Sequence, residues 1–140
     1  MKIIQKSIEK AKRITRCSVE NLNDKSTALV RSRIESLYAE GPSYKPLWER
    51  LNDQVGVFDP DGWKTVEKYP FNDNLVMFFD LDNEKTMYLF SSIGDVVKIL
   101  SECPGFVFYL TDCECTFLLC HNDHDYLIGA GDAKGWVSSR

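Results

Sequence analysis

Four short apolar runs in the second half of the chain constrain its fold more than any other feature. They are rich in Phe, Tyr, Leu and Val, and they occupy residues 75–80, 86–90, 106–110 and 116–120. Runs of five or six such residues are short for helices and are typical of strands. The polar stretch 81–85 separates the first two runs and Thr111–Glu114 separates the last two, so each pair is predicted to form a hairpin.

A helix is expected between the two hairpins. Ser91 and Ser92 can cap its first turn, the apolar residues of 96–100 recur with helical spacing, and Pro104-Gly105 ends it after about Glu102. The order after residue 74 is therefore β-β-α-β-β. Residues 124–130 can add a final strand or a turn of helix, and the three glycines that follow Ile128 weaken any longer helix there.

The first forty residues read as helix. Residues 2–14 have strong helix formers, with isoleucines at helical spacing. Ser18 is the predicted N-cap of a second helix that ends before Gly41-Pro42, and a short third helix is expected at 46–52. The stretch 53–73 is expected to be a long ordered loop with room for one short strand, because Asp59-Pro60-Asp61-Gly62 is a strong turn signal.

These elements predict an α+β fold in which N-terminal helices precede the β-β-α-β-β unit. The sheet is expected to be mainly antiparallel, with four or five strands and helices on one face. A length of 140 residues favours a single domain over 1–140. The N-terminal residues are charged throughout, so we expect no secretory leader, and a reducing cytosol in which the five cysteines are free thiols.

The chain also has a pronounced charge polarity. Residues 1–50 carry 11 Lys+Arg against 6 Asp+Glu, whereas residues 51–140 carry 6 against 15, within an overall net charge of −4. The acidic remainder disfavours nucleic acid as a direct partner. Lys2, Lys6, Lys10 and Arg13 share one helical face, which could touch an anionic surface but is more often a solvated face of a packed helix.

Most acidic residues of the second half fall at predicted loop tips or strand ends. Because the loops between neighbouring strands gather at the two ends of a sheet, these carboxylates can form one acidic rim. The aromatic residues Trp63, Tyr69 and Tyr126 lie near them in sequence and can anchor a contact. The members of the predicted rim are Asp59, Asp61, Asp80, Asp82, Glu84, Asp112, Glu114, Asp123 and Asp125.

Two further clusters leave alternatives open. Cys113, Cys115, Cys120, His121 and His124 include zinc-ligand types, but their spacing matches paired zinc elements poorly. The segment His121–Asp125 could hold a divalent ion or supply an acid/base pair, or it could simply be a turn in which Asn and Asp bond their own backbone. No nucleophile elbow, glycine-rich phosphate loop or HExxH motif is present, so no cofactor is expected and catalysis is the alternative hypothesis.

The chain resembles small bacterial immunity proteins of polymorphic toxin and contact-dependent growth inhibition systems. The resemblance covers residues 45–135 and is carried by Gly105–Gly131 with its Cys-His-Asn-Asp-His-Asp corner, by Trp48, by Asp61-Gly62-Trp63 and by Phe78-Phe79-Asp80. Asp123 stands where related sequences often have histidine. The resemblance implies a cytosolic, non-catalytic protein that binds a cognate toxin, often a nuclease with a basic cleft.

Together, the charge pattern and the resemblance predict a partner with a basic surface. No membrane contact is expected, and the chain is expected to be a monomer or a small homo-oligomer. A metal-dependent or acid/base enzyme centred on His121–Asp125 and a self-associating module remain the alternatives. The predicted partner-binding residues are Asp59, Asp61, Trp63, Asp80, Asp82, Glu84, Asp123, His124 and Asp125.

Overall fold

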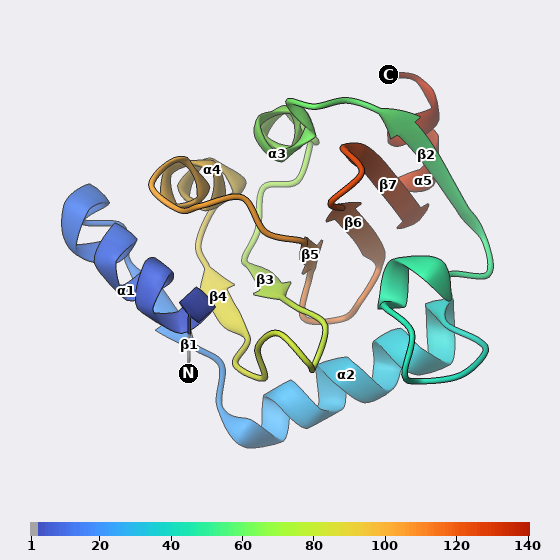
Figure 1. The fold of residues 1–140 in the computed structure, drawn as a ribbon, viewed down its shortest axis with the longest axis horizontal. Coiled ribbons are helices and arrows are strands. Elements are labelled where there is room, and N and C mark those ends of the chain that lie inside the picture. The colour runs from blue at the N-terminus through green and yellow to red at the C-terminus, as the bar shows by residue number, and fades with distance from the viewer. Residues whose placement is uncertain (1–2) are drawn as a thin grey trace.

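A seven-stranded sheet lies at the centre of the computed structural model, which describes residues 3–140 (Figure 1). Its strand order is β1-β4-β3-β5-β6-β7-β2, and every neighbouring pair is antiparallel. The strands are β1 (Val19–Asn21), β2 (Gln54–Phe58), β3 (Leu75–Phe78), β4 (Tyr88–Phe90), β5 (Phe108–Thr111), β6 (Phe117–His121) and β7 (Tyr126–Gly131).

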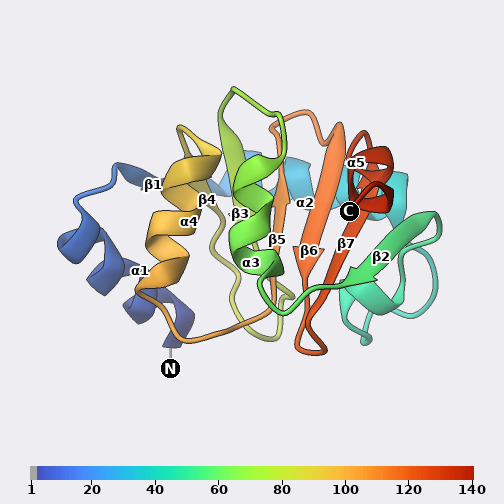
Figure 2. The ribbon, with the colours of Figure 1, turned by 90° about the horizontal axis from the view of Figure 1, so that it is seen from above.

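Helices cover both faces of this sheet. Figure 2 shows α1, α4, α3 and α5 in front of the strands, with α2 behind them. The α-helices are α1 (Ile3–Thr15), α2 (Asp24–Tyr38), α3 (Gly62–Thr65), α4 (Ile93–Ser101) and α5 (Lys134–Ser138), and the 3-10 turns are η1 (Leu47–Glu49) and η2 (Val66–Lys68). No helix within residues 3–140 has the length and apolar character needed to cross a bilayer.

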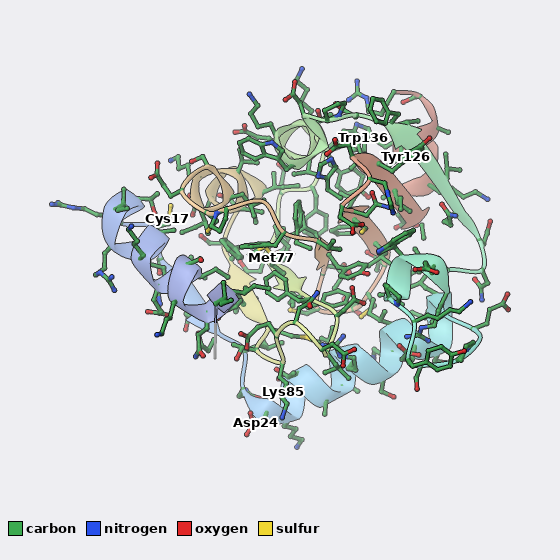
Figure 3. All side chains as sticks on the ribbon, viewed as in Figure 1. Cys17, Asp24, Met77, Lys85, Tyr126 and Trp136 are labelled. Atoms are coloured by element: carbon green, nitrogen blue, oxygen red, sulfur yellow. The ribbon has the colours of Figure 1, made fainter. Side chains whose placement is uncertain are left out.

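The apolar runs of the sequence are continuous because both sides of the central strands are buried. Leu75 and Met77 of β3 pack in the core beneath α1 and α4, whereas Val76 and Phe78 pack in a second core beneath α2. Met77 lies in the middle of the molecule in Figure 3. An alternating pattern would leave one face for solvent, while a continuous pattern requires cover on both.

The α+β class and the antiparallel sheet are confirmed, but the predicted strand number and helix placement are wrong. The sheet has seven strands instead of four or five: β7 is the final strand expected at 124–130, and β1 and β2 extend the sheet further. Helices lie on both faces instead of one, because Val30, Ile34 and Tyr38 give α2 its own apolar stripe and the second sheet face offers it a matching surface.

The local predictions were mixed. Ser92 caps α4 as expected, its hydroxyl accepting from Asp95 N at 3.1 Å. Ser18 does not cap a helix: the residues after it form β1, and α2 starts later, with the Asn23 side chain accepting from Ser26 N. The predicted helix at 46–52 is only the single turn η1, and the loop at 53–73 contains β2, α3 and η2.

The basic N-terminal helix lies at the β1 edge of the sheet, at the opposite side of the molecule from β2 (Figure 2). Ile4, Ile8 and Ala11 are buried there, while Lys6, Lys10 and Arg13 face solvent. This agrees with a packed helix that has a solvated basic face. Lys2, the first member of that predicted face, lies outside the described residues.

The close packing of α5 on β7 requires a glycine at position 129. A Cβ at Gly129 would lie 2.5 Å from Val137 Cγ2 and 2.9 Å from the Ala133 carbonyl oxygen, so α5 could not keep its distance from β7. We expect Gly129→Ala to lower the free energy of unfolding by about 1–3 kcal/mol, as overpacking typically does. Urea denaturation followed by tryptophan fluorescence measures this change.

Gly135→Ala is the matched control for this substitution. Position 135 lies in α5 itself, and nothing stands within 4 Å of its would-be Cβ. Alanine there should be neutral or stabilising by up to about 1 kcal/mol, because it has the higher helix propensity. Equal unfolding midpoints for Gly129→Ala and the parent protein would contradict the close packing of α5 on β7.

Candidate functional site: an acidic corner at one end of the sheet

Strand directions bring three connections to the same end of the sheet. Phe58 pairs with Tyr126, Phe108 pairs with His121, and Phe78 pairs with Tyr109. The connections that follow β2, β3 and β6 therefore emerge together. All nine predicted partner-binding residues lie on these connections or in the first turn beyond them: Asp59, Asp61, Trp63, Asp80, Asp82, Glu84, Asp123, His124 and Asp125. Asp112 and Glu114 lie in the β5–β6 turn at the other end, so they do not belong to this group.

Three of the predicted carboxylates accept hydrogen bonds from within the protein. Asp80 accepts hydrogen bonds from Leu47 N at 2.8 Å and from the Tyr109 hydroxyl at 3.0 Å. Burial raises the pKa of Tyr109, which keeps that hydroxyl a donor. Glu84 is only 3 % exposed and accepts from Thr86 N. Asp59 accepts from the backbone N–H of Asp61 and from the hydroxyl of Thr65.

The β3–β4 connection has a mixed charge. Asp82 is exposed, but it lines a cavity together with Arg31, Lys45 and Arg50. Lys85 of the same connection reaches toward Asp24 at the start of α2, as Figure 3 shows. Lysine and arginine side chains thus accompany the carboxylates at the β3–β4 connection. The acidic rim predicted from the sequence is therefore not uniformly acidic there.

The acidic character concentrates where the β2–α3 and β6–β7 connections meet. Asp59 N donates to the Asp125 carbonyl oxygen at 2.8 Å, and the His121 Nε2 group contacts the Asp59 carbonyl oxygen at 2.9 Å. Asp61, Asp123 and Asp125 are exposed beside this junction. We call Asp59, Asp61, Asp123 and Asp125 the acidic corner. Within residues 3–140, no lysine or arginine forms an ion pair with any of the four.

A buried asparagine shapes the corner. Asn122 Oδ1 accepts from both His124 N and Tyr126 N at 3.0 Å, which closes the tight turn between β6 and β7. Asp125 adopts a φ of 62°, a left-handed conformation that Asp and Asn tolerate better than most residues. The turn predicted from the side-chain chemistry of residues 121–125 is therefore present, and it presents Asp123 and Asp125 outward.

Exposed aromatic side chains flank the acidic corner. Phe58 is 65 % exposed and Tyr126 is 42 % exposed, and their rings form an edge-to-face pair across β2 and β7 with centroids 5.8 Å apart. Trp63 is half-buried on α3. Tyr69, which was expected to be a further anchor, is buried against Phe71 and Phe117 and belongs to the core. Phe58 was expected to pack the loop at 53–73 against the core, but it lies in β2 with its ring largely exposed.

Two cavities flank the β6–β7 turn on opposite sides. One has a volume of about 520 Å³ and is lined by Trp63, Phe106, His121, Asp123 and Asp125, among others. The other, of about 560 Å³, is lined by Trp48, His124 and Tyr126. His121 and His124 therefore line different cavities.

The candidate metal ligands do not converge. Cys113 and Cys115 lie in the turn at the far end of the sheet, and Cys120 is buried beneath the α2 face. Burial raises the pKa of the Cys120 thiol well above its usual value, which disfavours the thiolate that a metal needs. Among residues 3–140, no three His, Cys, Asp or Glu side chains are grouped so that they could hold a metal ion.

No protein-family model, curated protein or solved structure matches this chain.

The junction at the acidic corner depends on Gly62. A Cβ at this position would lie 2.6 Å from His121 Cδ2 and 3.2 Å from Leu127 Cβ. We expect Gly62→Ala to displace the imidazole from the Asp59 carbonyl and to lower the free energy of unfolding by about 1–2 kcal/mol. Long-range ¹⁵N–¹H NMR of the ring should show that His121 no longer keeps its proton on Nε2.

Gly56→Ala provides the comparison, because its nearest contact would be an ordinary 3.5 Å to Ile128 Cγ1. It should leave both the stability and the imidazole spectrum of His121 close to those of the parent. An unchanged His121 spectrum in Gly62→Ala would show that the histidine does not depend on this close approach.

Proposed function

We propose that this protein is a non-catalytic binding protein that neutralises a basic partner, as an immunity protein neutralises a toxin domain in the cytosol of the cell that makes it. The observation that carries the proposal is the acidic corner, where exposed carboxylates from two connections adjoin one another and no lysine or arginine among residues 3–140 pairs with them. Such a surface complements the basic active cleft of a nuclease, which normally receives phosphates.

The charge distribution favours fast and oriented capture. The acidic corner lies near the β2 edge, while the exposed lysines of α1 lie at the β1 edge (Figure 2). A molecule with its charges separated in this way turns its acidic end toward a basic partner during encounter. The carboxylates need only their ordinary ionised state for this role, so no catalytic chemistry is required.

The exposed aromatic pair supplies contact energy that charge alone does not. Phe58 and Tyr126 adjoin Asp59 and Asp125 in the chain, so a partner docked on the carboxylates also covers these rings. Interface hot spots are enriched in aromatic side chains surrounded by polar groups that exclude water. The combination of unpaired charge and exposed aromatic surface supports a protein interface over a solvated loop.

The proposal predicts a charge-dependent association rate. We would use the intact protein as bait in its native cell extract, purify the captured partner, and measure association by stopped-flow fluorescence at several salt concentrations. The triple variant Asp61→Asn, Asp123→Asn, Asp125→Asn should associate at least tenfold more slowly at low salt and should lose most of the salt dependence.

A variant with the same net charge is the control. Glu20, Glu40 and Glu67 are exposed and lie away from the acidic corner, so their replacement by glutamine removes three negative charges elsewhere. This variant should keep an association rate within about twofold of the parent. The proposal is wrong if both triple variants slow association equally, or if the parent rate does not change with salt.

A further inference from the structure

The cavity of about 520 Å³ beside the acidic corner has the form of a ligand site. It lies between α3, the α4–β5 connection and the β6–β7 turn, three segments that are far apart in sequence. Ligand-binding cavities typically enclose about 300–1,000 Å³, with apolar walls and a few converging polar groups. We call this cavity the corner cleft.

The walls of the corner cleft are aromatic. Trp63 contributes from α3, Phe106 from the α4–β5 connection and Phe108 from the start of β5. Trp63 and Phe106 are partly exposed, so a ligand can reach them, while Phe108 is buried and closes the floor. Aromatic faces carry negative electrostatic potential and attract cations.

The residues that line the cleft also include hydrogen-bond acceptors. Asp123 and Asp125 are among them. His121 is only 7 % exposed, and because its Nε2 contacts a carbonyl oxygen, Nε2 must carry the proton. Nδ1 of the neutral ring is then an acceptor, and it has no hydrogen-bond partner among residues 3–140.

In the part of the chain that the structure describes, no lysine or arginine lines the corner cleft. Its one thiol, Cys103, remains neutral because burial raises the pKa of the group to about 11. The cleft therefore combines aromatic walls, carboxylates and a histidine acceptor, without a cation to neutralise them.

We propose that the corner cleft binds the guanidinium group of an arginine side chain, which a basic partner inserts as its anchor. The identity of the partner rests on the proposed function, but the chemistry of the cleft does not. A guanidinium is planar and stacks on a ring such as Trp63, while its N–H groups point in several directions toward Asp123, Asp125 and His121. An ammonium group offers a single point charge and matches this arrangement less well.

Lys64 shows that the Trp63 ring already attracts a cation. Its Nζ lies 5.5 Å from the centroid of the Trp63 ring, although Lys64 is exposed and does not line the cleft. An arginine that enters the cleft meets the repulsion of this ammonium group. Replacement of Lys64 by glutamine should therefore strengthen the binding of arginine in the cleft. If Trp63 only supported the fold, this replacement would leave arginine binding unchanged.

The test uses a small probe and the full chain. Titration of ¹⁵N-labelled protein with N-acetyl-L-arginine amide should shift the Trp63 indole N–H and the amides of 121–125, with a dissociation constant of about 1 mM. N-acetyl-L-lysine amide should bind at least threefold more weakly. N-acetyl-L-norleucine amide, which has the stem without the charge, should produce no saturable shift.

Three variants locate the site. Asp123→Asn with Asp125→Asn should weaken probe binding at least fivefold, and asparagine retains the left-handed conformation of position 125. Trp63→Leu should weaken it by a similar factor, whereas Lys64→Gln should strengthen it about twofold. The glutamine variant of Glu20, Glu40 and Glu67 should bind as the parent does, and each variant's amide spectrum reports whether it is folded.

The outcomes separate this inference from the proposed function. Absence of saturable arginine binding, or binding that is unaffected by the Asp123 and Asp125 amides in a folded variant, would overturn the cleft as a guanidinium site. If a basic partner still associates through the acidic corner in that case, only the anchor arginine is wrong. If the probe binds in the cleft but no charge-dependent partner exists, the proposed function fails and the guanidinium site stands.

Discussion

The sheet has apolar side chains on both faces, and this constraint determines where recognition can occur. Residues such as Val76 and Met77 alternate in direction along β3, yet both are fully buried, so helices must cover each side. The covered faces have no room for a partner. The sheet itself presents polar groups at its ends and edges, where the connections emerge, and the acidic corner lies at such an end.

The acidic corner itself is held by backbone contacts between segments that are distant in sequence. The Asp59–Asp125 hydrogen bond and the His121 contact with the Asp59 carbonyl join the residues after β2 to those after β6. Since β2 and β7 are neighbours only in the folded sheet, these carboxylates come together only when the sheet is complete. Their mutual repulsion is tolerated because three of them remain in solvent, which screens like charges at this spacing.

The sequence predicted the central strands well because their signal is local. The runs that became β3, β4, β5 and β6 carry enough apolar residues to be recognised alone, and Ser92 has the chemistry of a helix cap. β1 is too short and too polar to be recognised, since Glu20 and Asn21 are exposed and the strand exists by pairing with β4. The gathering of the nine candidate residues at one end depends on the strand order of the folded sheet, which the sequence did not predict. The inward role of Asp80 was not predicted either, because the groups that bind it, Leu47 N and the Tyr109 hydroxyl, lie about thirty residues away on either side.

The proposed function requires a negative potential at residues 59–61 and 122–126, and this potential can be measured without any partner. Paramagnetic relaxation of backbone amide protons by a cationic nitroxide, compared with a neutral nitroxide of the same size, reports local potential residue by residue. We expect the excess relaxation by the cationic probe to be largest at the acidic corner and smallest along α1. An even distribution over the surface, or a maximum at the β5–β6 turn around Asp112, would contradict it.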